Sequence, residues 1–136
     1  IDRLLFGLAD RLDGPLGKEQ ICFSGPVDQP IKYDPKKARE LLAEAGYKDG
    51  GPVIDFYTAA GRYISDRQIS EVMAQMLSQV GFKVNLHAPE WAGLWADIRT
   101  GKTPMFYMGR GLVLDPSEPL AQLFETGITP RIGYSN

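Results

Sequence analysis

From residue 34 onward, the apolar residues of the chain switch repeatedly between a helical period and a strand period. Asp34 and Pro35 make a favourable helix start, because Asp is a common N-cap and Pro is tolerated at the first helical position. Apolar side chains then recur at helical spacing, at Ala38, Leu41, Leu42 and Ala45. The sequence therefore predicts an amphipathic helix that ends near Gly46.

Three strands are expected after this helix, each followed by a further helix. The first is the β-rich run 53–58, the second is the alternating stretch 82–87, and the third is the apolar run 105–108. Because 105–108 is apolar throughout, we expect it to be buried on both faces of the sheet. The alternation predicts the α/β class, with a mixed sheet flanked by helices.

The helices after these strands have recognisable starts. The spacing of Ser65 and Gln68 predicts a capping box at the start of the second helix. Pro89 opens the next helix, in which Trp91 and Trp95 share a face, and we interpret both as core residues. Asp115 opens the last helix, and a role as its cap is sufficient to explain this residue.

Residues 1–32 differ from the rest of the chain because they show no sustained period and contain many glycines and prolines. We interpret 1–32 as an irregular lead-in segment and 33–136 as an α/β lobe. The chain begins with Ile1 in place of Met and ends at Asn136 without a terminating pattern, so we expect it to be incomplete at both ends.

Composition excludes several classes of protein. Hydrophobic residues make up 43% and charged residues 24%, which is typical of a globular domain. A net charge of −2 with scattered Lys and Arg argues against binding to nucleic acid. A single cysteine, Cys22, excludes an internal disulfide framework and a multi-cysteine metal site. Phosphate-loop and dinucleotide motifs are absent, so no cofactor is expected.

An enzyme is the weaker alternative. Cys22 and His87 are a conceivable thiol–imidazole pair, but nothing in the sequence orients either residue. A hydrolase using Asp115, Glu90 or His87 lacks a motif that pairs a nucleophile with a base. We therefore expect a protein that binds a ligand without catalysing a reaction.

Ligands of open α/β sheets bind beyond the carboxyl ends of the strands, and two loops there are candidates. The first contains Arg62, a bidentate donor for a carboxylate, and Tyr63, which offers a flat face and a hydroxyl. The second contains Arg110 between Gly109 and Gly111, directly after the third strand. These five residues are the candidate ligand-binding set.

With these segments in place, the chain resembles the extracellular solute-binding proteins of peptide and nickel ABC importers. The strongest element is YDPKKARELLAEAGYKDGG at 33–51. The helix plus GF at 66–82, EW at 90–91 and DPSEPLAQLF at 115–124 follow in the family's order. IDR at the start and GYSN at the end resemble motifs that lie inside the family's longer chains.

The resemblance implies one lobe of a two-lobed receptor that closes over a small-molecule or peptide ligand. It implies delivery to an ABC permease of the inner membrane, and a location in the periplasm or, as a lipoprotein, on the surface of a single-membrane bacterium. We expect the piece itself to be monomeric. A sensor that presents its ligand to a signalling partner has the same fold and remains the alternative.

Site residues carry over unevenly from this resemblance. In dipeptide-binding relatives an Arg and a Tyr after the first strand of this lobe hold the peptide carboxylate, and Arg62–Tyr63 match them with spacing that differs by one residue. Relatives also have Gly-Trp and then an acidic residue for the peptide's amine, whereas Gly109 is followed here by Arg110. Our hypothesis is that this protein binds an anionic or multiply carboxylated ligand, without anchoring a free N-terminal amine.

Overall fold

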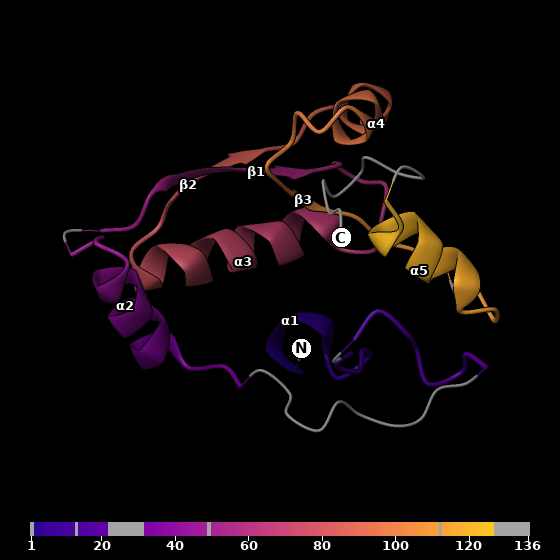
Figure 1. The fold of residues 1–136 in the computed structure, drawn as a ribbon, viewed down its shortest axis with the longest axis horizontal. Coiled ribbons are helices and arrows are strands. Elements are labelled where there is room, and N and C mark those ends of the chain that lie inside the picture. Colours follow the sequence, from indigo (N-terminus) through magenta and orange to yellow (C-terminus); the bar gives the residue numbers. More distant parts are fainter. Residues whose placement is uncertain (1, 13, 22–31, 49, 112, 127–136) are drawn as a thin grey trace. The chain divides into compact units, whose positions relative to one another are not determined.

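The computed structural model describes residues 2–12, 14–21, 32–48, 50–111 and 113–126. The chain forms two compact units (Figure 1). The sheet unit consists of residues 33–98 and 102–109, and the flanking unit consists of residues 1–32, 99–101 and 110–136. The sequence-based division into a lead-in of 1–32 and a lobe of 33–136 stays a prediction.

The sheet unit is built on three parallel strands in the order β2-β1-β3. Strand β1 is Val53–Thr58, β2 is Lys83–His87 and β3 is Met105–Tyr107. The register places Phe56 of β1 between Leu86 and Met105, and Phe56 is fully buried. The predicted α/β class is confirmed, and every pairing among the described strands is parallel.

The prediction that the third strand is buried on both faces is wrong for the described part of the chain. All three residues of β3 are half-buried. In the described sheet β3 lies at an edge and pairs with β1 alone, so its apolar side chains are covered less than those of a central strand.

Helices cover both faces of this sheet (Figure 1). Helix α3, Asp66–Val80, runs along one face and contacts β1 and β2. Helix α4, Trp91–Arg99, lies over the other face, where Leu94 and Ile98 form a buried cluster with Ala59. Helix α2, Pro35–Glu44, packs against α3 and begins as predicted, with the Asp34 carboxylate accepting from the Lys37 N–H at 2.9 Å.

The flanking unit contains helix α1, Asp2–Leu5, and helix α5, Ser117–Phe124. Its N-terminal segment is hydrogen-bonded to the residues that precede α5. The Gln20 side chain, 8% exposed, donates to the Val113 carbonyl at 2.8 Å, and the Ile21 N–H donates to the Leu114 carbonyl at 3.1 Å. Cys22 lies outside the described residues.

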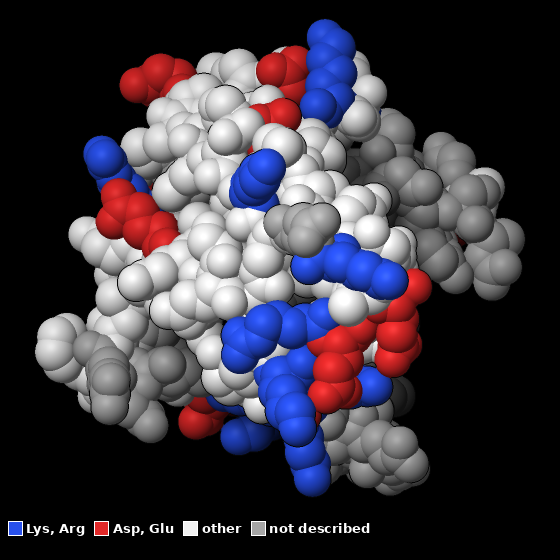
Figure 2. All heavy atoms as spheres, turned by 90° about the vertical axis from the view of Figure 1, so that its left-hand side faces the viewer, with Lys and Arg blue, Asp and Glu red and all other residues white. Residues whose placement is uncertain are grey.

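Two general features of the described residues can be reported. None of their helices is long and apolar enough to cross a bilayer. Figure 2 views the molecule from the side on which α2 lies in Figure 1, and on it Lys and Arg side chains lie beside Asp and Glu side chains.

Candidate functional site

The first candidate site lies in the loop that joins β1 to α3, at the carboxyl end of the parallel strands. Ala59 at the start of the loop is buried, and the chain then turns at Gly61, whose φ of +77° suits glycine. Arg62 and Tyr63 follow, so both residues lie where the sequence analysis places them. Loops at this edge of an α/β sheet are the usual position for ligands.

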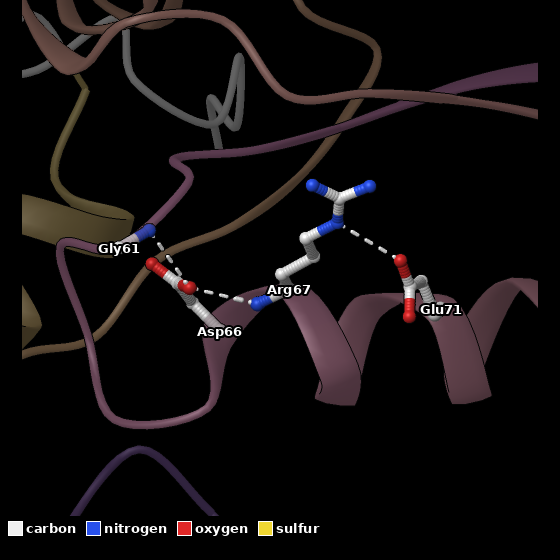
Figure 3. A network of polar contacts seen from close by, with 4 residues as sticks. All are labelled: Gly61, Asp66, Arg67 and Glu71. Carbon is white, nitrogen blue, oxygen red and sulfur yellow. Dashed lines mark hydrogen bonds and ion pairs between the residues drawn. The ribbon is translucent and has the colours of Figure 1, made fainter.

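A buried carboxylate, that of Asp66, holds this loop in shape (Figure 3). Asp66 is 2% exposed, and its two oxygens accept hydrogen bonds from four backbone N–H groups. The donors are those of Gly61 at 3.1 Å, Arg62 at 2.8 Å, Tyr63 at 3.0 Å and Arg67 at 2.7 Å. The backbone of the loop is therefore anchored directly to the first turn of α3.

The predicted capping box at the start of α3 is wrong. Ser65 has a φ of +51°, in the left-handed region, and its side chain makes no capping hydrogen bond. Asp66, one residue later, accepts instead from the loop N–H groups of residues 61–63 and from the Arg67 N–H of the first helical turn, because the loop folds back over its carboxylate. The cap thus depends on the path of the loop, which the spacing of Ser65 and Gln68 does not encode.

The pKa of Asp66 reflects two opposing effects. Burial raises it, while the N–H groups of Tyr63, Gly61, Arg62 and Arg67 lower it by more, so the net pKa is below the ordinary value. Asp66 is therefore ionised at neutral pH. The N–H dipoles of the loop backbone stabilise its negative charge.

The guanidinium of Arg62 lies over the indole ring of Trp91. Its central carbon is 4.2 Å from the centroid of the Trp91 ring, and its Nε donates to the Tyr63 hydroxyl at 3.4 Å. Arg62 is exposed, and in the described part of the chain no carboxylate forms an ion pair with it. Its terminal nitrogens are therefore presented to solvent on a side chain of restricted orientation.

Aromatic rings surround Tyr63. It meets the Trp91 ring edge-on at 5.9 Å and the Tyr107 ring edge-on at 6.3 Å. A Cβ at Gly109 would lie 2.7 Å from Tyr63 Cδ1, so the absence of a side chain at 109 makes room for this ring. The pKa of Tyr107 is raised by burial first and then by the negative charges of Asp66 and Tyr63.

The two tryptophans have the predicted core role, and one of them has a second role. Trp91 and Trp95 stack at 5.4 Å, and both pack against the buried cluster of α4. The face of Trp91 also supports Arg62. The sequence analysis missed this contact because the spacing along α4 reports which residues share a face and not what lies above them.

The second candidate loop leads from Gly109 of the sheet unit to Arg110 and Gly111 of the flanking unit. Arg110 lines a pocket of about 240 Å³ together with Gln20, Val113 and Pro119. Its side chain is 25% exposed and its Nη2 lies 3.9 Å from Oε1 of Glu118. Arg110 therefore already has a loose acidic partner, unlike Arg62.

Asp115 and His87, two of the residues considered for chemistry, have different partners in the structure. The N-cap of α5 is Pro116, so Asp115 lies one residue before the cap position predicted for it. Its Oδ1 accepts from the Ser117 N–H at 2.8 Å, and hydrogen bonds from Ser117 lower its pKa. His87 Nε2 lies 2.9 Å from Asp55 Oδ1, and its ring stacks on Tyr57 at 4.7 Å. Among the described residues no cluster of three or more His, Cys, Asp or Glu suits a metal ion.

Comparison with known proteins places the chain in a defined group. The family described as bacterial extracellular solute-binding proteins, family 5 Middle, matches residues 1–129. The glutathione-binding protein GsiB of Pectobacterium atrosepticum is 33% identical over 136 residues, which cover 95% of this chain and 26% of the relative.

Solved structures agree with this match. HbpA2 from Haemophilus parasuis aligns with a TM-score of 0.70 at 27% identity, over 82% of this chain and 22% of its own. The periplasmic binding protein DppA from Helicobacter pylori, solved with the peptide STSA, aligns with a TM-score of 0.62 at 28% identity, over 71% of this chain and 18% of its own. The chain thus spans about a quarter or less of the length of these relatives.

Proposed function

Because the chain belongs to the bacterial extracellular solute-binding proteins of family 5, we propose that it is a ligand-binding lobe of a receptor that delivers a small peptide-like solute to an ABC importer. The receptor closes two lobes over the solute and performs no covalent chemistry. Its place is the periplasm, or the cell surface as a lipoprotein, and its partner is the ABC permease of the inner membrane.

The proposal for the site rests on one observation, which is the position of the Arg62 guanidinium. The guanidinium is stacked on Trp91, bonded to the Tyr63 hydroxyl and exposed. A guanidinium held in one orientation loses little conformational entropy when it binds a carboxylate, which increases affinity. Arg62 therefore anchors a carboxylate of the ligand. The Tyr63 ring, for which Gly109 leaves room, lines the site beside it.

Arg110, which belongs to the flanking unit, is a separate proposed anion-binding residue. To bind an anion it exchanges the 3.9 Å contact with Glu118 for the ligand, and Gly111 leaves the backbone beside it open. Arg62 alone calls for a solute with at least one carboxylate. Glutathione has two, and GsiB of Pectobacterium atrosepticum is a glutathione-binding protein, so glutathione is the first candidate.

Calorimetric titration of the full-length protein tests this function. Glutathione and its diester, in which both carboxylates are masked, form the matched pair of ligands. We expect the diester to bind at least about tenfold more weakly, because it cannot form charge-assisted hydrogen bonds with the arginines. Equal affinities, or a co-purifying ligand without a carboxylate in mass spectrometry, contradict the proposal.

The absence of an amine anchor is tested separately with ordinary dipeptides. The proposal expects them to bind more weakly than glutathione, since the position of the acidic partner for the amine falls on Leu112 or Val113 in this sequence. Tight dipeptide binding that is unchanged in Arg110→Ala contradicts this part of the proposal.

A further inference from the structure

Asp66 is the most buried charged residue described in the sheet unit, with 2% of its surface exposed. Three of its four hydrogen bonds go to consecutive backbone N–H groups, those of residues 61–63. A helix cap needs one or two such bonds. The additional bonds fix the loop that carries the proposed ligand anchor.

The geometry of the loop explains how this constraint reaches the guanidinium. The carboxylate accepts from the N–H of Arg62 itself at 2.8 Å and from that of Tyr63 at 3.0 Å. These bonds set the direction in which both side chains leave the backbone. The Arg62 side chain then meets Trp91, and the Tyr63 ring meets Gly109.

We propose that Asp66 is the positioning residue of the ligand site, which sets the affinity for the ligand's carboxylate by holding the backbone of Arg62 and Tyr63 without touching the ligand. The inference rests on the proposed function, because it acts through Arg62. It predicts that the charge on Asp66 matters for binding in a protein that remains folded.

A double-mutant cycle in the full-length protein, with glutathione as the probe, separates positioning from a general structural role. Asp66→Asn keeps the shape of the side chain but places an amide where two backbone donors converge. We expect it to weaken binding about tenfold in the wild-type background, which is the range for a misplaced charge-assisted contact. In an Arg62→Ala background the same change has less than about a twofold effect, since the group it positions is gone.

Asp34→Asn is the matched control, because Asp34 caps α2 in the same unit, bonds to the Lys37 N–H and is remote from the loop in sequence. It should leave affinity within about twofold of the wild type. If Asp66→Asn does not fold, as judged by circular dichroism, Asp66→Ser replaces it in the cycle, since a hydroxyl retains one acceptor on a short side chain.

Each outcome of the cycle decides the inference. Equal losses in both backgrounds, or no loss in either, overturn the positioning role while leaving the carboxylate anchor intact. If Arg62→Ala alone binds glutathione like the wild type, the proposed anchor fails, and the positioning role fails with it.

Discussion

Two loops follow neighbouring parallel strands, and each contains an arginine and closes with an aspartate at the next helix. In the loop after β1, the aspartate is buried and accepts four backbone N–H groups, and Arg62 is stacked on an indole. In the loop after β3, Asp115 is exposed and accepts from the Ser117 N–H at 2.8 Å, and Arg110 contacts Glu118 at 3.9 Å.

The comparison teaches that similar residue types at equivalent strand ends can be organised to very different degrees. The backbone of the first loop is held by Asp66, whereas the arginine of the second loop lies near an acidic side chain, which it would have to leave to bind a ligand as proposed. Preorganisation of this kind increases affinity because less order has to be created on binding. We therefore expect the first loop to contribute more to stability and to binding than the second.

The largest expected difference in stability is between variants that lack Asp66 and variants that lack Asp115. Asp66→Ala leaves four N–H groups without their acceptor, and we expect it to lower the free energy of unfolding by about 2 kcal/mol. Asp115→Ala removes one exposed bond and should have a clearly smaller effect. Urea unfolding of the full-length protein measures both, and equal losses would contradict the difference between the loops.

Acid should weaken the first loop in a way that depends on Asp66. Its pKa in the folded protein is below the ordinary 3.8, so its stabilisation is complete above that value and is lost as the pH falls through the folded pKa. The stability difference between the wild type and Asp66→Asn should therefore shrink between about pH 7 and about pH 3. Urea unfolding at several pH values measures it, and a difference independent of pH would show that the carboxylate's charge is not involved.

A smaller difference in stability is expected between alanine variants of the two glycines in the second loop, Gly109 and Gly111. Gly109→Ala places a Cβ 2.7 Å from Tyr63 Cδ1, so the ring must shift, and we expect a loss of about 1 kcal/mol. A Cβ at Gly111 meets nothing within 4 Å, so Gly111→Ala should be nearly neutral. Thermal unfolding of the two variants compares them, and an equal change in melting temperature would mean that Tyr63 is not packed as described.

The sequence predicted the elements well because their signals are local. Periodicity places α2, the three strands and α4 close to their observed positions, and Asp34 caps α2 as expected. The extent of burial of β3 was wrong, because it depends on how many strands pair beside it. Local patterns report the type of an element more reliably than its surroundings.

The candidate site was predicted in part. The position of Arg62 and Tyr63 follows from the order of strand and loop, but the contacts that organise them do not. Asp66 was missed because its role requires the turn at Gly61 and the left-handed Ser65, which bring the loop back over α3. An Asp at the start of a helix, shortly after a glycine turn, is the one signal that could have suggested it.

The most direct test of the account compares the two arginines as ligand anchors. Calorimetry of the full-length protein with glutathione, on Arg62→Ala and Arg110→Ala, should give losses of about tenfold or more for Arg62 and a smaller loss for Arg110. Arg67→Ala, on the exposed side of α3 and paired with Glu71 at 3.0 Å, is the control and should bind like the wild type. A larger loss for Arg110→Ala than for Arg62→Ala would contradict the claim that the loop organised by Asp66 carries the stronger anchor.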